Sequence, residues 1–156
     1  MHLYFVRHGL ANWPSWSGND AERPLTGDGL RRMEAAARGL AKRDLKLDLI
    51  LHSPYLRAAQ TADIIAQQLA LTEAMREHHL LQPGFNLKAL KRVLKEHSKA
   101  EGLMLVGHAP DMSEVVTELT GESVRLKEGT VACVKLKESG EAKLLWLATA
   151  EELAEE

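Results

Sequence analysis

LYFVRHG, residues 3–9, places four large apolar side chains directly before an arginine, a histidine and a glycine. A short apolar run that stops at polar and turn-forming residues is typical of a strand buried on both faces. We therefore predict a strand over Leu3–Val6. Two more runs repeat the arrangement: Leu47–Leu51 stops at His52, and Leu103–Val106 stops before His108. The sequence thus predicts three buried strands, each followed by polar residues.

Segments with helical spacing of apolar residues separate these strands. After a long polar loop over residues 11–26, a helix is expected to begin at Thr26–Gly29, and others are expected over residues 55–69, over 87–97 and after Pro110. Ser53 is expected to cap the second of these helices, with Pro54 at its first position. The alternation of strands and helices predicts an α/β fold, a mostly parallel sheet with helices on both faces.

The C-terminal part of the chain follows a different pattern. Residues 130–137 and 143–148 alternate apolar and polar side chains on either side of a turn at Ser139-Gly140, which predicts an antiparallel hairpin. The acidic residues 151–156 are expected to form a solvated tail. We predict that residues 1–156 form a single domain, since 156 residues suffice for one core and are few for two.

Composition and charge limit the functional classes. The chain is 45% hydrophobic and 27% charged, as in ordinary soluble globular proteins, and its net charge of -2 gives no overall attraction to nucleic acid or to a membrane surface. The single cysteine, Cys133, excludes an intrachain disulfide and indicates a reducing compartment. The start of the chain does not resemble an export signal, and no apolar run approaches the roughly 20 residues of a membrane span. We expect a cytoplasmic protein.

The polar residues after the three strands are of matching kinds. Arg7 and His8 follow the first strand, Arg57 lies shortly after the second, and His108 follows the third. Ligands of parallel α/β sheets bind at the carboxyl ends of the strands, so these side chains are expected to meet in one pocket. Guanidinium groups match phosphate oxygens, and an unprotonated imidazole is a nucleophile. Neighbouring arginines are expected to keep the imidazole neutral by lowering its pKa.

Three motifs resemble those of the histidine phosphatase superfamily, also called phosphoglycerate mutase-like. They are VRHG at residues 6–9, SPYLRAAQTA at 53–62 and VGH at 106–108. The small size, RPLT at 23–26 and GHAP at 107–110 look most like the SixA-type phosphohistidine phosphatase branch. The similarity spans residues 1 to about 120 in the order of the family. It implies the phosphoglycerate mutase-like fold and a phosphatase that works through a phosphohistidine intermediate, with no metal and no cofactor.

The resemblance also implies a role for each matching residue. His8 would be the nucleophile that is transiently phosphorylated, and Arg7 and Arg57 would bind the phosphoryl oxygens. His108 would complete the catalytic pocket and contact the substrate. Arg23, in the RPLT segment, would be a further substrate contact. The implied partner is a protein that carries phosphohistidine, or a small phosphorylated metabolite.

Two departures from the family pattern bear on the substrate. Ala109 stands where many members have asparagine, and larger members carry an acidic proton donor in the middle segment, where this chain has only Glu77. An alkoxide leaving group needs a general acid, whereas the imidazole of a phosphohistidine leaves readily once protonated. The sequence therefore favours phosphohistidine. A small-molecule phosphomonoester phosphatase or mutase remains an alternative, as does a module that binds phosphate or a phosphoprotein without catalysis.

Other histidines and aromatic residues have structural interpretations. His52 is expected to pack at the end of its strand. His78 and His79 are adjacent and cannot share a strand face, which argues against a metal site there. Trp13 and Trp16 either form a lid over the substrate or pin the long loop to the body of the protein.

Overall fold

The computed structural model describes all 156 residues and confirms the predicted α/β fold. Its six-stranded sheet has the order β3-β2-β4-β1-β5-β6. The first four strands in that order are parallel, and β5 and β6 form the antiparallel hairpin. The strands are β1 (His2–Arg7), β2 (Leu49–His52), β3 (Met75–Glu77), β4 (Gly102–Gly107), β5 (Val131–Leu136) and β6 (Ala142–Ala148).

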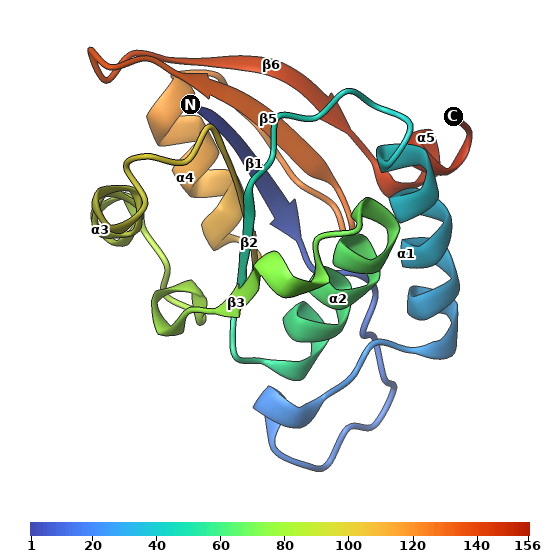
Figure 1. Ribbon diagram of the computed structural model, residues 1–156. Coiled ribbons are helices and arrows are strands. Elements are labelled where there is room, and N and C mark those ends of the chain that lie inside the picture. The colour runs from blue at the N-terminus through green and yellow to red at the C-terminus, as the bar shows by residue number, and fades with distance from the viewer.

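Helices cover both faces of the sheet (Figure 1). They are α1 (Gly27–Leu40), α2 (Leu56–Leu69), α3 (Leu87–Glu96), α4 (Asp111–Thr120) and α5 (Ala150–Ala154), with short 3-10 turns at η1 (Asp20–Glu22), η2 (Thr72–Ala74) and η3 (His79–Leu81). None of the helices is long and apolar enough to cross a membrane.

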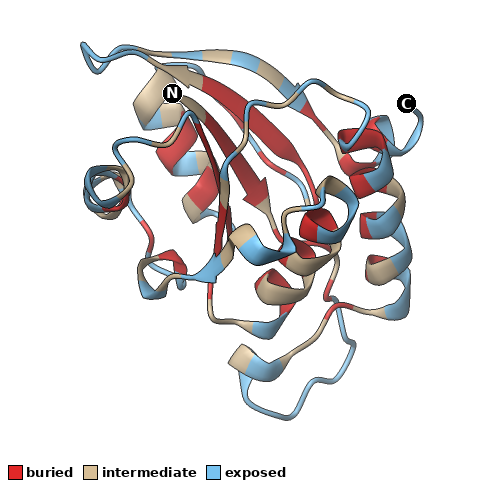
Figure 2. Ribbon diagram, viewed as in Figure 1, coloured by how far each residue is buried: buried red, intermediate tan, exposed pale blue.

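The alternation of side chains along β1 divides the core in two. Tyr4 and Val6 pack with α1, α2 and α5, whereas Leu3 and Phe5 pack with α3 and α4 on the other face. All four side chains are at most 1% exposed. Figure 2 shows the central strands as buried apart from some of their end residues, as expected for parallel strands covered by helices on both sides.

The register of the central strands aligns their polar ends. Arg7 pairs with Gly107 across β1 and β4, and His52 pairs with Val106 across β2 and β4. The amide of His8 continues the ladder by donating to the carbonyl of Gly107 at 3.0 Å. The three motifs therefore leave the sheet at the same edge.

Two glycines allow α1 to lie close to other backbone segments. A Cβ atom on Gly29 would lie 2.1 Å from the carbonyl oxygen of Leu10, and one on Gly39 would lie 1.6 Å from that of Leu153. Gly29 fixes the start of α1 against the loop that follows β1. Gly39 lets α5 rest on the end of α1.

Two predictions about local structure were wrong, and one strand was not predicted. Pro54 does not open a helix, because α2 begins at Leu56 with Tyr55 as its N-cap, and the Ser53 hydroxyl bonds elsewhere. The short edge strand β3 was not expected, since its sequence MRE has no apolar alternation and depends on pairing with β2. The acidic tail forms α5, because Leu153 is buried against α1.

Candidate active site

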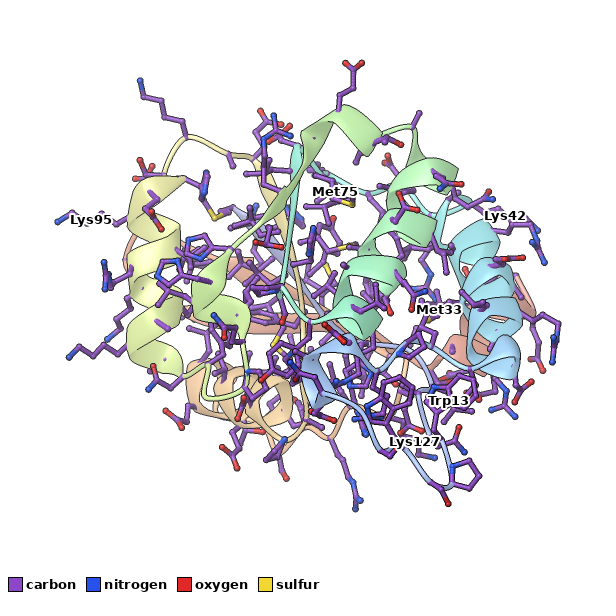
Figure 3. The ribbon with its side chains drawn as sticks, turned by 90° about the horizontal axis from the view of Figure 1, so that it is seen from below. Trp13, Met33, Lys42, Met75, Lys95 and Lys127 are labelled. Atoms are coloured by element: carbon purple, nitrogen blue, oxygen red, sulfur yellow. The ribbon has the colours of Figure 1, made fainter.

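All five predicted site residues line one cavity of about 440 Å³ at the carboxyl edge of the sheet. Arg7 and His8 come from the end of β1, Arg57 from the first turn of α2, and His108 from the turn between β4 and α4. Arg23 reaches the cavity from the long loop. Figure 3 looks onto this edge, and the labelled Trp13 belongs to the same loop. The other lining residues are Leu10, Ala11, Asn12, Asp20, Pro83, Ala109 and Glu128.

The imidazole of His8 is fixed in one tautomer. Its Nδ1 atom lies 2.7 Å from the carbonyl oxygen of Gly9, and because a carbonyl can only accept, Nδ1 carries the proton. Nε2 is therefore the unprotonated nitrogen. The pKa of His8 is lowered to about 4, mainly by burial and also by the charges of Arg57, Arg7 and Arg23, against the opposing effect of the Gly9 carbonyl. The sequence predicted that the arginines would lower this pKa, but burial lowers it more than they do.

Arg57 is the most buried cation of the cavity, with 5% of its surface exposed. Its Nη1 donates to the backbone carbonyl of Asp20 at 2.8 Å, and its Nη2 donates to the Asp20 carboxylate at 3.1 Å. The guanidinium also lies 5.0 Å from the ring centroid of Tyr55. Arg57 is thus held from both sides before any substrate binds.

Two carboxylates that the sequence analysis missed line the cavity. Asp20 accepts from Arg23 Nε at 3.0 Å as well as from Arg57, and these bonds lower the pKa of Asp20, the bond to Arg23 most of all. Glu128 lies 3.2 Å from Nη1 of Arg7. Glu77, the carboxylate considered from the sequence, ends the edge strand β3 and does not line the cavity. In the sequence, Asp20 lies three residues before Arg23, and this spacing could have indicated the ion pair between them.

His108 is oriented by Ser53. Its Nε2 lies 2.8 Å from the Ser53 hydroxyl, which already accepts from the amide of Tyr55 at 3.1 Å. Since that hydroxyl makes no other hydrogen bond, we assign its proton to the bond with Nε2, which leaves the imidazole proton of His108 on Nδ1. The pKa of His108 is lowered to about 3, mainly by burial and to a smaller extent by the charges of His8 and Arg57.

Three buried nitrogen atoms of the cavity residues have no hydrogen-bond partner within the protein. They are Nε of Arg7, Nε of Arg57 and Nδ1 of His108. Buried donors are nearly always paired in folded proteins. Three such donors around one cavity, together with the cationic side chains, suit a polyvalent anionic ligand such as a phosphoryl group.

Thr61 ties the turn after β1 to α2. Its hydroxyl accepts from the amide of Gly9 at 3.0 Å and donates to the carbonyl of Arg57 at 2.7 Å, and the residue is fully buried. The two bonds fix the spacing between the segments that carry His8 and Arg57. Thr61 belongs to the motif at residues 53–62, but this contact was not predicted from the sequence.

The remaining polar candidates lie outside the cavity. His52 bonds the carbonyl of Ser53 through Nδ1 at 2.8 Å, and His78 pairs with Glu96 at 2.9 Å. No group of three histidine, cysteine, aspartate or glutamate side chains is close enough to hold a metal ion.

The two tryptophans of the long loop bond the backbone of that loop. Trp13 donates to the carbonyl of Pro24 at 2.8 Å, and Trp16 donates to that of Asn19 at 3.1 Å. The indole groups therefore hold the loop together, and neither hydrogen bond ties the loop to the body of the protein.

Comparisons with known proteins point to one superfamily. The model of the histidine phosphatase superfamily (branch 1) matches residues 3–82. An uncharacterised protein of Picosynechococcus is 35% identical over 150 residues, covering 92% of this chain and 88% of that protein. The phosphohistidine phosphatase SixA of Escherichia coli is 27% identical over 150 residues, covering 94% and 92% respectively.

Solved structures agree with this assignment. The protein histidine phosphatase SixA complexed with tungstate has a TM-score of 0.88 and 26% identity, and the match covers 98% of this chain and 99% of that one. The alpha-ribazole phosphatase from Shigella flexneri has a TM-score of 0.71 and 20% identity, with 96% and 97% coverage, and shares the fold.

Proposed function

Because the chain belongs to the histidine phosphatase superfamily and is a phosphatase, we propose that it works through a phosphohistidine intermediate on His8 and acts on phosphohistidine in a protein. One observation carries the proposal. The unprotonated Nε2 of His8 belongs to the same cavity as Arg7, Arg23 and Arg57. An anion-binding site and a neutral nucleophile therefore coincide.

In the first step, Nε2 of His8 attacks phosphorus as the bond to the leaving group breaks. The guanidinium groups of Arg7 and Arg57 and the Nδ1 proton of His108 stabilise the charge on the phosphoryl oxygens. Arg57 must exchange the Asp20 carboxylate for a phosphoryl oxygen. In the second step, water attacks the phosphorus, which releases inorganic phosphate and returns the electron pair to Nε2.

The ionised carboxylate of Asp20 favours a nitrogen leaving group. The pKa of Asp20 is lowered, so this side chain is ionised at neutral pH and is a poor proton donor. A departing imidazole accepts its proton from water, whereas an alkoxide needs a positioned acid. Similarity to the phosphohistidine phosphatase SixA of Escherichia coli supports the same substrate class.

Glu128 supports a second candidate, a phosphomonoester phosphatase. Its carboxylate lines the cavity and its side chain is 37% exposed, so it can exchange protons with solvent close to a leaving group. A protonated Glu128 would supply the general acid that an alkoxide requires.

A substrate panel distinguishes the two candidates. We expect kcat/KM to be highest for a phosphohistidine peptide and for phosphoramidate, and lower for sugar phosphates, nucleotides and phosphoglycerates. Glu128→Gln should leave the phosphohistidine reaction intact, and His8→Asn should abolish it. A preference for phosphomonoesters that depends on Glu128 would support the second candidate instead. Binding of phosphate without turnover of any substrate would contradict both.

A further inference from the structure

Helix α3 presents a row of cations that have no partners in the protein. Lys88, Lys91, Arg92 and Lys95 recur at helical spacing, and all four are exposed. None of them takes part in an ion pair or in a side-chain hydrogen bond, whereas Arg7, Arg23, Arg32, Arg43 and Arg57 all do. In Figure 3 the labelled Lys95 extends away from the body of the molecule.

A hollow of about 420 Å³ lies between this helix and the η3 turn. Lys88 and Arg92 line it, together with His79, and no aspartate or glutamate does. Pro83 lines both this hollow and the cavity that contains His8. The basic hollow therefore borders the active-site cavity at Pro83.

We propose that the basic hollow binds an acidic segment that flanks the phosphohistidine on the protein substrate. This inference rests on the proposed function and extends it from the phosphoryl group to the surrounding polypeptide. The hollow supplies charge complementarity for glutamate and aspartate side chains, while the cavity holds the phosphoryl group itself.

The cluster of cations on α3 stands out against the slightly negative net charge of the chain. The net charge is -2, so attraction to an acidic partner has to arise from a local patch. Unpaired lysine and arginine side chains at a rim act mainly by steering encounter and by selecting partners of opposite charge. Such an effect weakens with added salt, because the charges are exposed.

A nucleic acid is a less suitable occupant of the hollow. Single-stranded nucleic acids bind where aromatic side chains stack on successive bases next to a basic groove. No phenylalanine, tyrosine or tryptophan lines this hollow, and Trp13 and Trp16 lie on the loop that carries Arg23.

Two synthetic phosphohistidine peptides of equal length test the proposal, one flanked by glutamates and one by serines, with free phosphohistidine as a third substrate. We expect the wild-type enzyme to prefer the glutamate peptide and the preference to fall with added salt. In Lys88→Glu/Arg92→Glu, kcat/KM for the glutamate peptide should fall about tenfold. The value for free phosphohistidine should change by less than about twofold, because the cavity is untouched.

Arg38→Glu/Lys143→Glu is the matched control. Both residues are exposed and in no ion pair, and the double change alters net charge by the same amount. It should retain the preference for the glutamate peptide.

Equal loss in the control and in the α3 variant would overturn the proposal, as would an unchanged preference in the α3 variant. Salt-sensitive binding of single-stranded RNA that requires Lys88 and Arg92, without any peptide preference, would assign the hollow to nucleic acid. If neither of the peptides nor free phosphohistidine is hydrolysed, the proposed function itself fails, which is a separate result.

Discussion

Replacing His8 with asparagine should change how stability depends on pH. The ordinary histidine pKa is 6.5, and burial together with the neighbouring arginines lowers that of His8 to about 4 in the folded protein. Between these values the unfolded chain binds a proton that the folded protein does not, so the free energy of unfolding falls as pH falls. From pH 7 to pH 5 this linkage amounts to about 2 kcal/mol for His8. His8→Asn removes that contribution.

Urea denaturation of both proteins at several pH values measures this effect. We expect wild type to lose about 2 kcal/mol more than His8→Asn between pH 7 and pH 5. Above pH 7 the two stability curves should run parallel, because the imidazole is neutral in both states. Curves that stay parallel down to pH 5 would show that burial does not hold His8 neutral, and the reasoning about the nucleophile would fail.

Three substitutions test other contacts. Asp20→Asn should tighten binding of inorganic phosphate up to about fivefold by calorimetry, since an ion pair whose carboxylate is exposed is worth about 1 kcal/mol or less. Equal or weaker binding would contradict competition by the carboxylate. Thr61→Val leaves a buried amide unpaired and should lower the free energy of unfolding by about 1–3 kcal/mol in urea; an unchanged midpoint would argue against this link. Gly39→Ala should displace α5 and lower the free energy of unfolding by about 2 kcal/mol. In the control Gly27→Ala the added Cβ atom meets only a flexible side chain, so the free energy of unfolding should hardly change.

The strands and the polar residues at their ends could be predicted because both are marked by short stretches of local sequence. An apolar run that stops at a polar residue marks the end of a buried strand, and the carboxyl ends of parallel strands meet at one edge. From these two facts the sequence predicts that Arg7, His8, Arg57 and His108 share a pocket, and all four line the same cavity in the structure.

Contacts across loops could not be predicted in the same way. Asp20 reaches Arg57 from a segment with no periodicity, and its carboxylate belongs to the cavity only through the path of that loop. Ser53 resembled a helix cap in the sequence, but its hydroxyl bonds His108, which is 55 residues away. The helix α5 begins at a capping box of Thr149 and Glu152, a local signal that was overlooked, and Leu153 then packs on α1.

The most direct measurement of the central claim is the site of phosphorylation during turnover. Labelled phosphoramidate is mixed with the enzyme, the reaction is quenched in alkali within the first turnover, and the labelled residue is located by mass spectrometry. We predict that the label lies on His8 in wild type and is absent from His8→Asn, which should not turn over. Label on His108 or His52 instead, or normal turnover by His8→Asn, would contradict the account.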